Sequence, residues 1–448
     1  MVGTIVLAVT VPSLGAESLR GYLVVQGDRV LAAENPDLLF TPASVLKLVV
    51  ASAALHHLGA DYSVRTEVRV QAPIVDGVLR GDLVLLAAGD PSWSEEFFEE
   101  GAETPISRLA EQVAGEVEVI EGDLVVDLHR FPGRRHAPSR PQIELGVGFA
   151  APTAGLALEA NAFEVRIAPG SRVGAPGVVS TDAAVELVNE ILTVGSSRDG
   201  KGNVDFLPEW GSPRVRVKGE YPISEGSYRV VTSHPAPELH VGERLRHHLV
   251  EAGVEVRGVV RVSSEAQAGR RVLAHFNSPS LAKILVPVLE DSANWVAEMV
   301  LQVLALEVLG EGRLDDGVEL LESFLLEEVV LPVGSFALED ASGLSPYNLI
   351  APRAVVGLLR FASRQTWRGA LFDSLPSSGE GTLSMWPRLA VRQAKTGTIT
   401  HTLALAGVLG DGDEEPAFFA VFLNHDLRER PEQRAEIAKL LSEWKLEM

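Results

Sequence analysis

The chain has 448 residues, which is more than one ordinary domain contains and suggests two or three domains. Hydrophobic residues make up 46% and charged residues 22%, so a sizeable core can form, and the composition argues against global disorder. The formal net charge of −22 would repel nucleic-acid phosphates and anionic lipid headgroups, so we expect no nucleic-acid partner. The sequence contains no cysteine, which excludes disulfides, thiolate metal sites and a cysteine nucleophile.

The first 16 residues leave several interpretations open. No apolar run in the sequence reaches the length of a membrane-spanning helix. Residues 1–16 are apolar and end in small residues, as a signal peptide does, but they lack a basic start and Pro12 interrupts them. They therefore indicate a weak export signal, a misplaced start or a buried first strand.

The next segments predict a hairpin and a buried helix. Residues 21–35 alternate in polarity around a Gly-Asp turn, which is typical of a β-hairpin. A helix is expected over residues 42–58, with Thr41 as N-cap, Pro42 in the first helical position and Gly59 at the far end. Because this helix is apolar on nearly every side, we expect it to run through the middle of a core.

The residue pattern changes over residues 63–272 and predicts an inserted β-rich region of one or two subdomains. Short β-branched runs are separated by Gly, Pro and Asp, and only a few helical patches interrupt them. The predicted strands are 64–70, 78–86, 117–126, 163–167, 214–217, 228–231 and 254–262, and the predicted helices are 106–114, 183–194 and 237–252.

Helical periodicity returns after residue 281. The predicted helices are 283–289, 295–309, 315–325, 352–363 and 431–445, and the predicted strands are 390–395, 403–409 and 417–423, with a turn at 411–413. The chain therefore begins and ends in one α/β domain, residues 1–62 plus 273–448, and a β-rich insertion, residues 63–272, separates the two parts.

Ser44 and Lys47 combine a nucleophile with a candidate base. They stand three residues apart in the first turn of the predicted helix, so they share one face. The N–H groups of a first turn have no intrahelical acceptor, so the N–H of Ser44 suits a developing oxyanion. A lysine buried beside another cation, here Lys395, loses proton affinity and can take the serine proton. The alternative is a surface serine and lysine, which the isolated charge of Lys47 in an apolar helix argues against.

Ser292 and Asn294 precede another predicted helix. A serine hydroxyl can pass a proton from Lys47 to a leaving amine, and an asparagine can hold the lysine and the substrate backbone in register. The alternative is that these residues cap the helix, since Ser and Asn are favoured at N-caps.

Lys395, Thr396, Gly397 and Thr398 end a predicted strand. Glycine lets a substrate approach the backbone of an edge strand, and the lysine and threonine hydroxyls can bind a terminal carboxylate. The N–H of Thr398 is the candidate second oxyanion donor. The alternative is an ordinary β-turn. The three groups in this order, S-x-x-K, S-x-N and K-T-G, form the motif set of serine acyl-transferases that react with penicillin.

With these motifs the chain resembles the S13 peptidase family, the low-molecular-mass class C penicillin-binding proteins of the D-alanyl-D-alanine carboxypeptidase/endopeptidase type. The resemblance runs from about residue 21 to the C-terminus. It includes F-T-P-A-S at 40–44, G-D-P-S at 89–92, A-S-G-L-S at 341–345 and the L-P and G-T-L groups within 375–383. The long separation of Ser44 from Ser292 differs from class A β-lactamases and leaves room for the family's domains II and III.

The resemblance implies a serine transpeptidase/β-lactamase-like α/β/α sandwich interrupted by the β-rich insertion. It implies a serine DD-peptidase that cleaves D-Ala-D-Ala in peptidoglycan stem peptides, and D-Ala cross-links as a further expectation, through an acyl-enzyme that β-lactams also form. No metal or organic cofactor is implied, and the location is extracytoplasmic. The implied catalytic residues are Ser44, Lys47, Ser292, Asn294 and Lys395, and the implied substrate-binding residues are Thr396, Gly397, Thr398 and Asp127.

Several positions depart from the family pattern. Ala293 stands where aspartate is common, Glu290 where a basic residue is common, Ala341 where a glycine is usual and Pro346 where an arginine is usual. Loss of that arginine leaves open how a charged third-residue side chain of the stem peptide is held. A non-catalytic cell-wall-binding homologue and a β-lactam hydrolase remain alternative functions, and the oligomeric state stays open.

Overall fold

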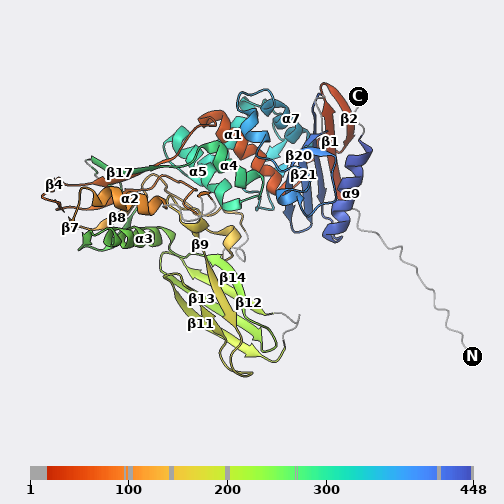
Figure 1. The fold of residues 1–448 in the computed structure, drawn as a ribbon. Helices are drawn as coiled ribbons and strands as arrows, with labels where there is room; N and C mark the ends of the chain where they lie inside the picture. Colours follow the sequence, from red (N-terminus) through yellow and green to blue (C-terminus); the bar gives the residue numbers. More distant parts are fainter. Residues whose placement is uncertain are drawn as a thin grey trace, which may run out of the picture.

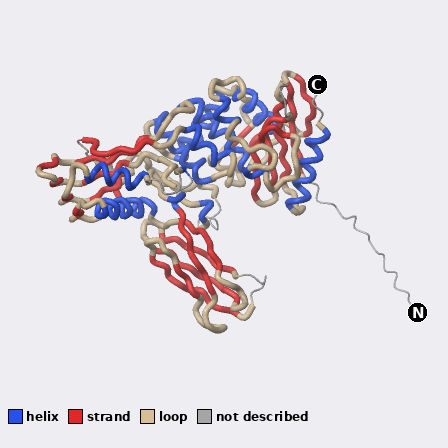
Figure 2. The backbone as a smooth tube through the Cα atoms, in the orientation of Figure 1, coloured by secondary structure: helices blue, strands red, loops and turns tan. Residues whose placement is uncertain are grey.

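The computed structural model describes residues 18–94, 97–98, 104–140, 146–196, 202–267, 269, 271–410 and 415–444. The predicted export segment, residues 1–16, and the turn predicted at 411–413 lie outside the described residues. Figures 1 and 2 show a sheet at one end of the molecule, a group of helices next to it, one β-rich body at the opposite end and a second that projects below the middle. Within the described ranges, no helix combines the length and apolar character that crossing a membrane requires.

A five-stranded antiparallel sheet joins the two ends of the chain (Figure 1). Its strand order is β2-β1-β22-β21-β20, so the N-terminal hairpin pairs with the last strand of the chain and β20 lies at an edge. The strands are β1 (Leu19–Gln26), β2 (Arg29–Glu34), β20 (Val391–Ile399), β21 (Thr402–Leu409) and β22 (Ala417–Asn424). The hairpin predicted over residues 21–35 is confirmed.

Both faces of this sheet are covered by helices, because successive side chains of a strand point to opposite faces. In β22, Phe418 and Phe422 belong to the helical core, whereas Phe419 and Val421 pack with α9 (Arg430–Glu443). The helices on the other side are α1 (Lys47–Leu58), α4 (Leu281–Leu289), α5 (Asn294–Leu309), α6 (Leu314–Glu327), α7 (Pro352–Ala362) and α8 (Arg368–Phe372). The α/β/α arrangement predicted from the sequence is present.

The helix over residues 42–58 begins differently from the prediction. Residues Ala43–Leu46 form a 3-10 turn, η1, and the α-helix α1 begins at Lys47. Thr41 is not the N-cap, because its hydroxyl donates to the carbonyl oxygen of Pro346 at 3.3 Å. The expected burial is confirmed, since α1 is inaccessible to solvent from Lys47 to Leu55.

The inserted region contains two β-rich bodies. The first has the strand order β16-β8-β6-β3-β17 beside a smaller sheet β15-β7-β5-β4, and α2 (Pro105–Ala114) and α3 (Pro237–Glu251) cover it. Its strands are β3 (Arg65–Val70), β4 (Ile74–Val75), β5 (Val78–Leu79), β6 (Leu83–Leu86), β7 (Val119–Ile120), β8 (Leu124–Asp127), β15 (Glu255–Val256), β16 (Val260–Ser263) and β17 (Arg271–Asn277).

The second body is made of two three-stranded sheets that share a small apolar core (Figure 2). Its strands are β9 (Ala162–Ala168), β10 (Val178–Ser180), β11 (Glu186–Val194), β12 (Asn203–Glu209), β13 (Arg214–Pro222) and β14 (Tyr228–Ser233). Two further short strands, β18 (Phe336–Ala337) and β19 (Leu349–Ile350), pair near the helical group. Where the insertion begins and ends stays a prediction.

Two further local predictions were wrong. The helix predicted over 183–194 is the strand β11, which pairs in parallel with β13 over its whole length. Its apolar residues fit both periodicities, and burial of Ile191 in the core of the second body decides for the strand. The strand predicted to end at Lys395 continues to Ile399, so Lys395, Thr396 and Gly397 lie inside β20.

Phe422 tests whether the sheet depends on its contact with the helical core. Its ring is fully buried and stacks on Phe40 with 5.7 Å between the centroids. Phe422→Ala should lower the local free energy of opening of β22 by about 3–5 kcal/mol, since it leaves a cavity. Hydrogen exchange of the β22 amides measures this. Leu427→Ala, at a side chain with 66% exposure, should change little. Equal protection in the two variants would contradict the packing described.

Candidate active site

Ser44 and Lys47 are brought together by η1 and the start of α1. Lys47 is completely buried, whereas Ser44 is partly exposed. The Nζ of Lys47 lies 2.9 Å from the Oγ of Ser44. The predicted pairing of nucleophile and base therefore has hydrogen-bonding geometry, and a substrate can reach the serine while the lysine stays dry.

Two oxygen atoms fix the direction of the lysine amine. Lys47 Nζ donates to the Oδ1 of Asn294 at 2.7 Å and to the carbonyl oxygen of Ser342 at 2.6 Å. Asn294 Nδ2 faces the carbonyl oxygen of Phe149 at 3.5 Å, which agrees with its Oδ1 facing the lysine. A neutral amine has two hydrogens and one lone pair. Since both hydrogens are taken by acceptors, the lone pair points at the hydroxyl of Ser44.

Because Lys47 is buried, the neutral form of its amine is populated near neutral pH. Removal from water lowers the pKa of Lys47 from 10.5 to about 7. The carboxylates of Asp340 and Glu298 oppose this effect and raise the pKa, while the guanidinium of Arg140 lowers it further. A substantial fraction of Lys47 is thus uncharged at neutral pH, as a general base requires.

Lys395 lies in β20, against the turn that carries Ser44. Its side chain is fully buried, and its Nζ donates to the carbonyl oxygen of Thr396 at 3.1 Å. Burial first, and then the charge of Lys47, hold the pKa of Lys395 well below its usual value. The expected proximity of two cations is therefore present, and Arg140 adds a third that the sequence did not indicate.

Gly397 allows β20 to approach η1. A Cβ at this position would lie 2.6 Å from the carbonyl oxygen of Pro42 and 3.1 Å from the backbone nitrogens of Ser44 and Val45. The glycine was expected to make room for a substrate, but the atoms it accommodates belong to the turn of the nucleophile. Thr396 is buried next to it, and Thr398 is exposed.

Ser292 lies in the connection between α4 and α5. Its φ of +64° lies in the left-handed region, which is unfavourable for a serine. Such backbone strain is kept only where the surrounding structure imposes it. The capping alternative is not supported, because the N-cap of α5 is Ala293 and none of the described side chains caps this helix. Asn294 is the first residue of α5 and reaches Lys47 from there.

Asp127 is the predicted substrate-binding residue that the structure does not bring to this group. It ends β8 in the insertion and is 1% exposed. Its carboxylate accepts hydrogen bonds from the backbone nitrogens of His129 and Gln267 and contacts the His129 ring at 2.8 Å. These contacts occupy both carboxylate oxygens within the insertion.

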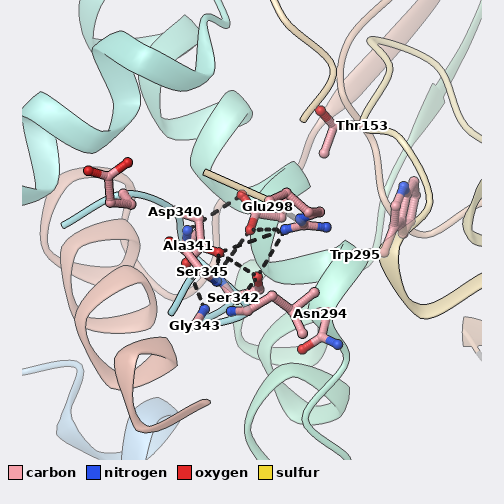
Figure 3. Close-up of polar contacts among 12 residues, drawn as sticks. Thr153, Asn294, Trp295, Glu298, Asp340, Ala341, Ser342, Gly343 and Ser345 are labelled. Atoms are coloured by element: carbon pink, nitrogen blue, oxygen red, sulfur yellow. Dashed lines mark hydrogen bonds and ion pairs between the residues drawn. The ribbon is translucent and has the colours of Figure 1, made fainter. Parts of the chain in front are cut away.

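The sequence did not reveal a buried group of charges that acts on Lys47; its two acids, Glu298 and Asp340, are labelled in Figure 3. Arg140 Nη2 lies 3.1 Å from Glu298 Oε1 and 3.8 Å from Asp340 Oδ2. Glu298 could have been found, since it is an isolated charge in the apolar helix α5, which is the signal that drew attention to Lys47. Arg140 gives no such signal, because it lies in an irregular segment of the insertion.

Comparison with known proteins identifies the family of the chain. A family model described as the D-Ala-D-Ala carboxypeptidase 3 (S13) family matches residues 8–444. A D-alanyl-D-alanine carboxypeptidase of Actinomadura sp. (strain R39) is 30% identical over 433 residues, which cover 91% of this chain and 78% of that protein. D-alanyl-D-alanine carboxypeptidase DacB of Haemophilus influenzae is 23% identical over 406 residues, covering 89% and 83% of the two chains.

The fold is shared with a solved structure. The crystal structure of penicillin-binding protein 4 (dacB) from Haemophilus influenzae matches with a TM-score of 0.85 at 22% sequence identity, and the match covers 96% of this chain and 97% of that one. The chain therefore belongs to the D-Ala-D-Ala carboxypeptidase 3 (S13) family, which confirms the family, the fold and the class of serine-type carboxypeptidase expected from the sequence.

Proposed function

We propose that the protein cleaves the terminal D-Ala-D-Ala bond of peptidoglycan stem peptides, and D-Ala cross-links between them, through an acyl-enzyme on Ser44. The observation that carries this proposal is the buried amine of Lys47, held 2.9 Å from a partly exposed serine hydroxyl by two fixed acceptors. The family match and the relatives named D-alanyl-D-alanine carboxypeptidase support the substrate.

Acylation follows from the positions of these groups. Ser44 Oγ attacks the carbonyl carbon of the scissile bond, and its proton passes to the lone pair of Lys47. The negative oxygen of the tetrahedral intermediate is bound by the N–H groups of Ser44 and Thr398. When the bond breaks, the leaving D-Ala amine takes a proton that Lys47 delivers through the Ser292 hydroxyl. Lys395 and the hydroxyls of Thr396 and Thr398 bind the carboxylate of the terminal residue.

Hydrolysis completes the cycle with the same groups. Water enters after D-Ala leaves, Lys47 takes its proton and the resulting hydroxide attacks the ester carbonyl. The proton then returns to Ser44 Oγ as the ester bond breaks. A β-lactam opens on Ser44 in the same first step, and its tethered leaving group hinders the second. Because the substrate is cell-wall material, we infer an extracytoplasmic location, in the periplasm or the cell-wall space.

Replacing the nucleophile tests the site of acylation. Ser44→Ala should abolish covalent labelling by a fluorescent penicillin, since no other hydroxyl is held against Lys47 among the contacts described. Ser442→Ala changes an exposed serine on α9 and should label like the wild-type protein. Intact mass before and after penicillin, with peptide mapping of the adduct, is the measurement. An adduct on any residue other than Ser44 would refute the assignment.

Removing the base should slow chemistry without removing the nucleophile. Lys47→Ala leaves Ser44 without a proton acceptor, so the acylation rate constant should fall by several orders of magnitude, on the order of 10³-fold or more. Lys283→Ala in α4 removes an exposed lysine and serves as the matched control. Stopped-flow labelling measures both rates. A Lys47→Ala variant that acylates at a near-normal rate would exclude the lysine as base.

The acylation rate should depend on pH through Lys47. Its pKa of about 7 means that the amine becomes protonated, and loses its lone pair, as the pH falls below that value. The rate should then drop about tenfold for each further pH unit. The second-order rate constant of penicillin acylation measured from about pH 5 to pH 9 reports this limb. A rate that stays level down to pH 5 would contradict a lysine base.

A further inference from the structure

A part of the inserted region that includes Arg140 contacts the catalytic domain next to the active site. The guanidinium of Arg140 is almost inaccessible, with 4% side-chain exposure, and it approaches three side chains of the catalytic domain. Arg140 Nη2 lies 3.1 Å from Glu298 Oε1, 3.3 Å from Ser342 Oγ and 3.8 Å from Asp340 Oδ2. The neighbouring Ser139 donates from its Oγ to Ser345 Oγ at 2.7 Å. The segment therefore contacts the 340–345 loop at two points.

The two carboxylates in this group hold the backbone of that loop (Figure 3). Glu298 accepts hydrogen bonds from the backbone nitrogens of Ser342 and Ala341, at 3.1 and 3.4 Å. Asp340 accepts from the backbone nitrogens of Gly343 and Ser345, both at 2.8 Å. Asn348 Nδ2 also donates to Asp340, at 2.8 Å. The backbone nitrogens on both sides of the Ser342 carbonyl are thus held by two buried acids, and Arg140 is the cation that lies next to both.

The peptide between Ser342 and Gly343 is the link to the chemistry. Its oxygen, the Ser342 carbonyl, accepts the hydrogen bond from Lys47 Nζ at 2.6 Å, and its nitrogen, that of Gly343, donates to Asp340 Oδ1 at 2.8 Å. Glu298 holds the preceding peptide through the Ser342 nitrogen. A rotation of the Ser342–Gly343 peptide would move one of the two acceptors that direct the amine. Gly343 packs so closely against the turn of the nucleophile that a Cβ would lie 1.9 Å from the carbonyl oxygen of Ala43. The loop has little freedom to adjust by itself.

We propose that Arg140, contributed by the inserted region, is a positioning residue. It holds Glu298 and Asp340 in place, and these acids fix the Ser342 carbonyl so that Lys47 presents its lone pair to Ser44. This inference rests on the proposed role of Lys47 as base. It gives the insertion a part in the chemistry that is separate from substrate binding. The amine of Lys47 is then correctly oriented only when Arg140 contacts Glu298 and Ser342.

The charges that face Lys47 make this role measurable. They are Arg140 from the insertion, Glu298 from α5, Asp340 from the 340–345 loop and Lys395 from β20, and Asp291 acts on Lys395. Arg140 lowers the pKa of Lys47, whereas Asp340 and Glu298 raise it. Removing the guanidinium should therefore raise the pKa of Lys47, because two buried carboxylates then favour its protonated form. Removing one carboxylate should lower that pKa.

Three variants form a cycle that separates positioning of the base from support of the fold. Arg140→Met should move the acid limb of penicillin acylation to higher pH by about one unit or more and slow the rate at pH 7 about tenfold. Glu298→Gln, which keeps an acceptor for the Ser342 nitrogen, should move the limb to lower pH. The double variant removes one charge of each sign, so its limb should return toward that of the wild-type protein.

The control is Arg135→Met on the same segment. Arg135 forms an ion pair with Glu238 at 2.8 Å within the insertion, so its loss tests the segment without touching the 340–345 loop. The acid limb of penicillin acylation by Arg135→Met should coincide with that of the wild-type protein. Thermal melting reports folding of each variant, and if Arg140→Met does not fold, Glu298→Gln and the double variant still carry the test. Folded variants whose limbs all coincide with the wild-type limb would overturn the inference. Wild-type protein that is never labelled would instead overturn the proposed function.

Discussion

The structure depends on one costly arrangement, the complete burial of the Lys47 amine beside the serine that it serves. An ammonium group taken out of water is strongly destabilised, so the lysine gives up its proton more readily than in solution. Burial alone does not orient the amine toward the serine. The Ser342 carbonyl and the Asn294 side chain supply that direction, because each takes one hydrogen of the neutral amine and leaves the lone pair facing Ser44.

The sheet, the helix α5 and the inserted region each contribute to this arrangement. The sheet carries β20 against η1, and the absence of a side chain at Gly397 allows the close approach. The helix α5 supplies Asn294 and Glu298 from successive turns, so one element provides an acceptor to the lysine and an acid to the loop behind it. The inserted region adds Arg140, which contacts Glu298 of α5 and also Ser342 and Asp340 on the loop that accepts the Lys47 hydrogen bond.

The proximity of Ser44 and Lys47 could be predicted because their motif is short and local. The spacing of Ser44 and Lys47 fixes their shared face, and the isolated charge of Lys47 in an apolar helix already indicated an unusual environment. The layered fold followed from alternating and helical periodicities at the two ends of the chain. The sequence could not reveal Arg140, because its partners Glu298 and Asp340 are far away in the chain and nothing local marks it.

Other differences arise where tertiary contacts decide between similar patterns. The segment 183–194 has residues that suit either a helix or a strand, and only the pairing of β11 with β13 settles the choice. The 3-10 turn before Lys47 replaces the expected helical start because Thr41 is held by the 346 carbonyl and Asn424 and does not cap the helix. The substrate role of Asp127 stays a prediction; in the structure its carboxylate oxygens accept hydrogen bonds from within the insertion.

The state of the Lys47 amine can be observed directly. Protein carrying lysine labelled at Cε with ¹³C, with the Lys47 resonance assigned by comparison with Lys47→Arg, can be titrated by NMR without substrate. The structure predicts that this resonance titrates with a midpoint near the pKa of about 7 given by burial. A Lys47 resonance that remains that of a charged amine up to about pH 10, the ordinary lysine range, would contradict the central claim.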